Sequence, residues 1–191
     1  PIRGCPYPCT FCTAKTYYGT KIRKKTVFRV IDEINYIIER FGIRDFLIWA
    51  DTFTADQDYV MEFCEAISQR GLPISWACNS RVDTVNDALL KQMAAAGCWM
   101  ISYGLESGDP HVLQKAKKNI TLHQAQEAVS MAQKNQISVA GHFILGLPGD
   151  SIESINKTIA FAKSLRLDFA QFYCATPFPG SPLFQMALKN Q

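Results

Sequence analysis

The chain has 191 residues, of which 48% are hydrophobic and 19% charged, as in a globular protein with one sizeable core. Its formal net charge of +3 is too small to indicate nucleic-acid binding, and no apolar run approaches the roughly 18 residues that a membrane span needs. Seven cysteines outside any small disulfide framework, without a signal peptide, predict a reducing compartment, and we expect the cytoplasm.

The first segment that carries chemistry is a cysteine-rich loop. Cys5, Cys9 and Cys12 have C-x3-C-x2-C spacing, so a short loop can turn three thiolates toward one point. Thiolates favour iron–sulfur clusters, Zn²⁺ or Cu⁺. A [4Fe–4S] cluster is usually held by four cysteines, so three leave one iron open to another ligand. The alternatives are a zinc site completed by a distant cysteine or histidine, and three unrelated cysteines.

Beyond this loop, apolar stripes with helical spacing alternate with short apolar runs. The segment 15–25 carries five cations and is interpreted as a solvated linker. We predict helices over 27–41, 59–67, 89–94, 121–135 and 151–165, and a last helix that begins at 182. We predict strands over 46–49, 74–78, 99–105, 138–145 and 169–174, the first of a kind expected for a strand covered on both faces.

Helix-capping residues support these boundaries. Asn86 is placed to cap the third helix, and Thr121 with Gln124 forms a capping box for the fourth. Five strands that alternate with helices predict a parallel α/β fold, either an open doubly wound sheet or a barrel. In both architectures, functional residues gather at the carboxyl ends of the strands.

The cysteine loop, in which the aromatic Phe11 precedes the last cysteine, resembles that of the radical S-adenosylmethionine (SAM) enzymes. The resemblance implies that Cys5, Cys9 and Cys12 bind three irons of a [4Fe–4S] cluster and that SAM chelates the fourth. It implies a flavodoxin- or ferredoxin-type electron donor, and cleavage of SAM to a 5′-deoxyadenosyl radical that takes a hydrogen atom from a small-molecule substrate. The sequence does not identify that substrate.

The same resemblance implies a partial TIM-type (βα)6 barrel. We expect the radical SAM core to occupy residues 1–191, with the cluster loop over 4–13 and strand–helix units over 27–191. The chain enters the cysteine loop at once, so we expect it to be a fragment that lacks the first strand of the barrel, which would lie just upstream of Arg3.

Asp51 follows the first predicted strand, where a carboxylate can accept a hydrogen bond from an ammonium group. The alternative role is to cap the next helix, which Asp56 could do instead. The resemblance implies that this turn holds the SAM amino group. Related sequences often have two acids here, and Ala50 occupies the first place.

Asn79, Arg81 and Glu106 follow the next two predicted strands. Arg81 could bind the methionine carboxylate of SAM, or form a structural salt bridge with Asp83 or Glu106. A buried glutamate needs donors, and ribose hydroxyls or the SAM ammonium would supply them. The alternative for Glu106 is an ion pair with Arg81.

The last two predicted strands complete the expected SAM site. By the resemblance, Ile144 would contact the adenine ring and Pro177 would lie in a rigid turn near it. We assign no role to His142, which is more often a core histidine than a catalyst.

Four short strings of the sequence look most like the cobalamin-binding group of radical SAM enzymes. They are G-C-P-Y-P-C-T-F-C, D-T-F-T, G-L-E-S-G and P-F-P-G-S-P-L. That group implies a methylase or an oxidative cyclase, with cobalamin bound by a domain for which this chain has no room. A methylthiotransferase is the alternative enzyme, and it would need a second cluster bound by three more closely coordinated cysteines upstream. We expect the remaining cysteines to be buried thiols instead: Cys64, Cys78, Cys98 and Cys174.

A non-catalytic module that binds zinc or a cluster is the alternative to an enzyme. It predicts that Asp51, Arg81 and Glu106 pair with one another and that no adenosine-sized cavity exists. The enzyme predicts an open pocket at the strand ends, surrounded by those residues and the cysteines.

Overall fold

The structure is a computed structural model that describes residues 1–189. Its main element is a parallel five-stranded sheet in which each strand pairs with the next along the chain. The strands are β3 (Asp45–Ile48), β4 (Ser75–Ser80), β5 (Cys98–Glu106), β6 (Ser138–Leu145) and β7 (Phe169–Cys174). The five predicted strands are therefore confirmed, with ends within two residues of the expected ones.

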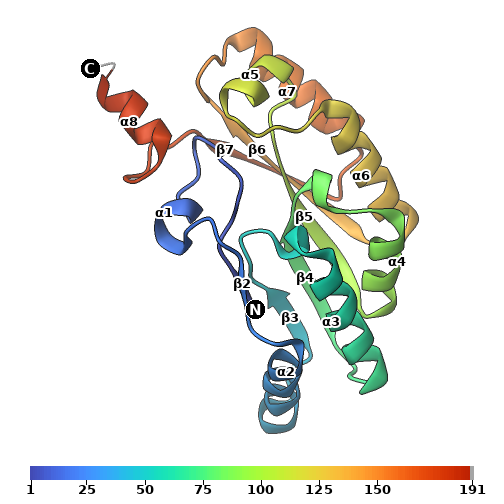
Figure 1. Cartoon of the computed structure of the whole chain (residues 1–191). Coiled ribbons are helices and arrows are strands. Elements are labelled where there is room, and N and C mark those ends of the chain that lie inside the picture. Colours follow the sequence, from blue (N-terminus) through green and yellow to red (C-terminus); the bar gives the residue numbers. More distant parts are fainter. Residues whose placement is uncertain (190–191) are drawn as a thin grey trace.

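Helices cover one face of this sheet, and Figure 1 shows α3, α4, α6 and α7 side by side along it. The long helices are α2 (Val27–Phe41), α3 (Gln57–Gln69), α4 (Asp87–Ala95), α6 (Leu122–Lys134) and α7 (Ile152–Ser164). A doubly wound sheet would have helices on both faces, so the open inner face supports a partial barrel. The expectation that the first strand is covered on both faces is wrong, since Leu47 in β3 is 55% exposed on the inner side.

The helix starts follow from their capping residues. The side chains of Asp56, Asn86, Thr121 and Ser151 each accept a hydrogen bond from the first turn of the helix that follows. Thr121 and Gln124 form the predicted capping box. The core lies between the helices and the outer face of the sheet, where the rings of Phe53, Phe63 and Trp76 meet edge to face.

Several short elements were not predicted. The expected linker over 15–25 instead contains most of α1 (Ala14–Tyr18) and all of β2 (Arg23–Lys24), which pairs antiparallel with β1 (Ile2–Arg3). Short turns of 3-10 helix, η1 (Phe53–Ala55) and η2 (Val82–Thr84), follow β3 and β4. The short helix α5 (Pro110–Lys115) was not predicted either. The last helix, α8 (Pro182–Lys189), begins at the predicted residue and projects away from the sheet in Figure 1.

The scattered cysteines divide into two kinds. Cys64, Cys78 and Cys98 are buried as expected, and burial raises the pKa of the Cys64 thiol to about 12. Cys174 is exposed on the edge strand β7, so the expectation of a buried thiol is wrong there. Among residues 1–189, none of the helices has the length and apolar character to cross a membrane.

Candidate functional site

The cysteine loop lies at the carboxyl ends of the strands, where backbone hydrogen bonds fix it from several sides. The N–H of Thr10 donates to the carbonyl of Ala116 after α5 (2.9 Å), and the N–H of Leu183 in α8 donates to the carbonyl of Thr10 (2.9 Å). The N–H of Cys5 donates to the carbonyl of Gly19 (3.1 Å). The loop is therefore held between segments that are far apart in the sequence, beside α8 (Figure 1).

The three cysteines line one cavity of about 540 Å³ together with residues from the ends of the strands. Burial raises the pKa of the Cys9 and Cys12 thiols, and at Cys9 the nearby Lys118 and Arg81 oppose that shift. A thiol must lose its proton to bind a metal, so neighbouring cations favour the metal-bound form.

The three thiols can be compared with what a zinc ion and an iron–sulfur cluster require. Within residues 1–189, no three His, Cys, Asp or Glu side chains come close enough to bind one metal ion. A zinc site needs its ligands around one centre. An iron–sulfur cluster is bound by cysteine thiolates. Three thiols around one cavity, with cations beside them, fit a cluster.

The cavity also collects most of the other predicted site residues. Phe11, Asp51, Asn79, Arg81 and Glu106 all line it. Its volume lies within the roughly 300–1,000 Å³ that small-molecule sites have.

Ile144 and Pro177, the two residues expected near adenine, are not in the cavity lining. Ile144 instead packs, with Phe11, against a small apolar cluster of Val112, Ala116 and Leu147. Pro177 is exposed in the loop after β7.

Asp51 ties the cysteine loop to the end of β3. Its Oδ2 accepts a hydrogen bond from the N–H of Gly4 (3.0 Å). Asp56, not Asp51, caps α3, so the carboxylate of Asp51 is free of that role. Among the described residues, Oδ1 of Asp51 has no hydrogen-bond partner and remains available to a ligand.

Arg81 is a buried cation that is 3% exposed. It forms a two-pronged salt bridge with Asp83 (2.8 and 2.9 Å), one of the two expected partners, and donates to the carbonyl of Lys118 (2.8 Å). Its guanidinium lies 3.7 Å from the ring centre of Tyr7, and Nη1 is 3.8 Å from the sulfur of Cys9. The guanidinium therefore braces the loop around Cys9.

Glu106 pairs with a residue that we did not predict. Nζ of Lys118 donates to Oε1 of Glu106 (2.7 Å), and both side chains are buried in the cavity wall. The ion pair with Arg81, which was the alternative role for Glu106, is therefore not formed. Glu106 has a positive φ of 64°, an unusual conformation for a residue other than glycine. Gly104 makes room for the pair, since a Cβ there would lie 2.4 Å from Oε1 of Glu106.

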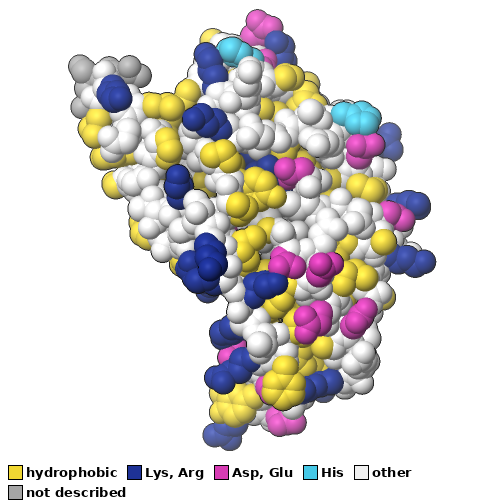
Figure 2. Space-filling view, viewed as in Figure 1, with side chains coloured by type: hydrophobic (Ala, Val, Ile, Leu, Met, Phe, Trp, Pro, Cys, Tyr) yellow, Lys and Arg dark blue, Asp and Glu magenta, His cyan; other side chains and the backbone are white. Residues whose placement is uncertain are grey.

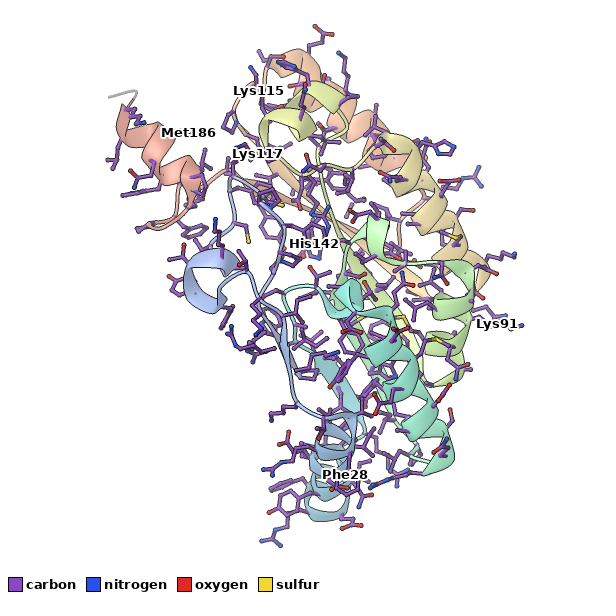
Figure 3. All side chains as sticks on the ribbon, in the orientation of Figure 1. Phe28, Lys91, Lys115, Lys117, His142 and Met186 are labelled. Carbon is purple, nitrogen blue, oxygen red and sulfur yellow. The ribbon has the colours of Figure 1, made fainter. Side chains whose placement is uncertain are left out.

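His142 also lines the cavity, although we assigned it no role. Its Nδ1 lies 3.1 Å from the hydroxyl of Tyr173, which donates to Oε1 of Gln171 (2.8 Å). The two rings are stacked with their centres 5.8 Å apart. Figure 3 shows His142 near the middle of the sheet, below the cysteine loop. Nothing in the sequence indicated the contact between His142 and Tyr173, which lie 31 residues apart.

Both predictions of the non-catalytic module fail. Asp51, Arg81 and Glu106 bond to Gly4, Asp83 and Lys118, not to one another. A cavity of ligand size is present where the enzyme requires it.

Comparison with known proteins shows the family to which the chain belongs. The profile described as "Radical SAM superfamily" matches residues 1–162. An uncharacterized methyltransferase of Pyrococcus horikoshii is 39% identical over 188 residues, which cover 98% of this chain and 41% of that protein. An anaerobic magnesium-protoporphyrin IX monomethyl ester cyclase of Cereibacter sphaeroides is 32% identical over 187 residues, 96% of this chain and 30% of that protein.

Among solved structures, the radical SAM methyltransferase TsrM of Kitasatospora setae, with tryptophan and a SAM analogue bound, superposes with a TM-score of 0.90. It is 19% identical and covers 98% of this chain and 38% of that one, which shows the shared fold. The chain thus spans less than half the length of these relatives.

Proposed function

Because the chain belongs to the radical SAM superfamily, we propose that residues 1–191 are the catalytic core of a radical SAM enzyme that binds a [4Fe–4S] cluster and SAM in the cavity beneath the cysteine loop. The observation that carries this proposal is the meeting of three cysteines with buried charged side chains around one cavity of ligand size. When bound, the reduced cluster and SAM supply a 5′-deoxyadenosyl radical, and the chain's own residues position both cofactors.

Cys5, Cys9 and Cys12 would hold three irons and leave the fourth for the amino and carboxylate groups of SAM. Oδ1 of Asp51, which has no partner among the described residues, would accept a hydrogen bond from an N–H of the SAM amino group. Lys118 would contact the carboxylate of SAM. Arg81, with its guanidinium already paired, holds Cys9 and adds positive charge beside it.

The remaining contacts concern the nucleoside. Oε1 of Glu106 is taken by Lys118, which leaves Oε2 for the ribose hydroxyls. Asn79 contributes an amide to the same wall. We place adenine on the side of Phe11, beside which Ile144 packs, and Pro177 remains a predicted contact from the resemblance.

For the whole protein we propose a cobalamin-dependent methylase or an oxidative cyclase, with a small-molecule substrate and a flavodoxin- or ferredoxin-type donor in the cytoplasm. The names of the relatives, a methyltransferase and a cyclase, support this choice. A methylthiotransferase would need a second cysteine site. Within residues 1–189, Cys64, Cys78 and Cys98 are instead part of the apolar core.

The experiment is anaerobic reconstitution with iron and sulfide, followed by measurement of bound iron and of 5′-deoxyadenosine formed from SAM with a chemical reductant. Alanine at Cys5, Cys9 or Cys12 is expected to abolish both signals. Cys174→Ala is the matched control, because it removes an exposed cysteine outside the cavity, and it should leave both unchanged. Full product formation by any of the three loop variants would refute the proposal.

A further inference from the structure

The inner cavity, where SAM is proposed to bind, continues into a second cavity of about 500 Å³ toward the amino ends of the strands, on the open face of the sheet. Four residues line both cavities: Met100, Ser102, His142 and Gln171. Of the two cavities, only the inner one is lined by the three cysteines of the loop. A molecule bound in the second cavity would therefore lie next to SAM without taking its place.

The walls of the second cavity are aromatic and nearly free of charge. Trp99 at the start of β5 and Phe169 at the start of β7 line it, and both rings are exposed. Among the described residues that line it there is no lysine or arginine, and the one acid, Asp168, accepts a hydrogen bond from the N–H of Val139 (2.7 Å). By contrast, Figure 2 shows many charged side chains over the helices α3, α4 and α6. Exposed aromatic rings around a cavity of small-molecule size favour a flat, uncharged ligand that stacks on them.

His142 supplies a hydrogen-bonding group to this otherwise apolar site. The hydroxyl of Tyr173 has one proton, which it donates to Oε1 of Gln171 (2.8 Å). The hydrogen-bond network therefore assigns a proton to Nδ1 of His142, which lies 3.1 Å from that hydroxyl and donates to it. Burial lowers the pKa of His142, so the ring is neutral near pH 7 and Nε2 carries a lone pair. Nε2 has no hydrogen-bond partner among the described residues and is able to accept a hydrogen bond from a ligand.

From these observations we propose that the second cavity binds the substrate, that this substrate is a flat, uncharged ring system with an N–H or O–H group, and that Nε2 of His142 selects it by accepting a hydrogen bond from that group. This inference rests on the proposed function, which places SAM in the adjoining cavity. His142 is then a specificity-determining residue, because a ring without a donor leaves Nε2 unpaired. Stacking of the His142 and Tyr173 rings, with centres 5.8 Å apart, holds the imidazole in position.

The test uses the full reconstituted chain with its cluster oxidised, with and without SAM, so that no SAM is cleaved. The probes are 2-naphthol, a flat ring system with one O–H donor, and 2-methoxynaphthalene, the same rings with the donor methylated. Calorimetry gives the dissociation constants, and side-chain ¹⁵N NMR reports the hydrogen bond to His142. The other two histidines, His111 and His123, are exposed and outside the cavity, so they serve as internal controls. SAM cleavage with a chemical reductant is measured in parallel.

Three variants separate the acceptor from the aromatic walls. His142→Phe keeps a ring and removes the acceptor, and Phe169→Ala removes one of the exposed rings. Phe28→Ala is the matched control, because Phe28 is 65% exposed against 56% for Phe169 and does not line the cavity. Figure 3 shows Phe28 on α2, well away from His142.

Wild type should bind 2-naphthol about fivefold more tightly than 2-methoxynaphthalene, as expected for one additional hydrogen bond. The Nε2 resonance of His142 should shift with 2-naphthol and not with its methyl ether. His142→Phe should lose the preference for 2-naphthol, and Phe169→Ala should weaken the binding of both probes. Phe28→Ala should match wild type with both.

Equal affinity of wild type for the two probes, or a preference that survives His142→Phe, would overturn the proposal. Displacement of 2-naphthol by SAM would overturn it as well, since the probe would then occupy the inner cavity. If wild type cleaves SAM but binds neither probe, the substrate class is wrong. If wild type fails to cleave SAM, the proposed function itself fails, whatever the probes show.

Discussion

Lys118 donates a 2.7 Å hydrogen bond to Glu106, and the two side chains, 12 residues apart, are both buried in the wall of the inner cavity. A buried charge left without its partner is costly, whereas loss of both charges costs much less. We expect Lys118→Met to lower the free energy of unfolding by about 3–5 kcal/mol. The measurement is urea denaturation of the protein without cofactors.

Glu106→Gln combined with Lys118→Met supplies the control for that prediction. The double variant should recover most of the stability, because no uncompensated charge remains, yet it should bind SAM weakly. Tight SAM binding by the double variant would show that neither Glu106 nor Lys118 belongs to the proposed SAM site.

Arg81 should affect the bound cluster more than the fold. Its Nη1 lies 3.8 Å from the sulfur of Cys9, and loss of an outer-shell partner of a metal ligand typically changes metal affinity or activity by about 10–100-fold. We expect Arg81→Lys, which loses the two-pronged contact with Asp83, to bind iron more weakly. We also expect a lower reduction potential, since a donor near sulfur is lost. Arg70→Lys, which alters a surface pair with Asp32, is the control in a redox titration and should match wild type.

Asp51 and Asp56, the two acidic residues after β3, should have different effects when they are replaced. One replacement should reduce the bound iron, and the other should reduce the free energy of unfolding. Asp51→Ala removes the bond to Gly4 and is expected to lower the iron retained per chain after reconstitution. Asp56→Ala removes the cap of α3 and should lower the free energy of unfolding by about 1 kcal/mol with iron content unchanged. Equal iron loss in both variants would show that Asp51 has no special link to the loop.

His142 should give a pH dependence of stability. Burial lowers its pKa; Lys118 acts in the same direction, Glu106 opposes it, and Tyr173 is its hydrogen-bond partner. The unfolded chain takes up this proton near pH 6.5, whereas the folded protein does so only at lower pH. Stability should therefore fall as the pH drops below about 6.5 toward the folded pKa. Denaturation at pH 7.5 and 5.5 checks this: His142→Gln should lose less stability between the two than wild type, and an equal loss would contradict it.

Local patterns predicted the strands and the helix caps because those depend on neighbours in the sequence. Thr121 with Gln124 is such a case. The partner of Glu106 could not be found in this way, since α5 and a turn bring Lys118 back to the strand end. One signal was present in the sequence. Lys118 lies two residues from each of the apolar residues Ala116 and Ile120, and all three are buried, whereas Lys117 and Asn119 between them are exposed.

The hydrophobic periodicity of the sequence likewise could not predict that no helices cover the inner face of the sheet. The apolar run of β3 has the same composition whether one or both faces are covered, and only the resemblance favoured a barrel. Exposure of Trp49 (60%) and Leu47 (55%) reflects the open cavity on that side.

The central claim is that three cysteines leave one iron open for SAM. It is tested most directly by EPR of the reduced, reconstituted protein with and without SAM. The account predicts a [4Fe–4S]⁺ signal that changes when SAM is added, and that responds less in the variant with Glu106→Gln and Lys118→Met. A cluster signal that SAM leaves unchanged, or uptake of zinc with no cluster formed, would contradict it.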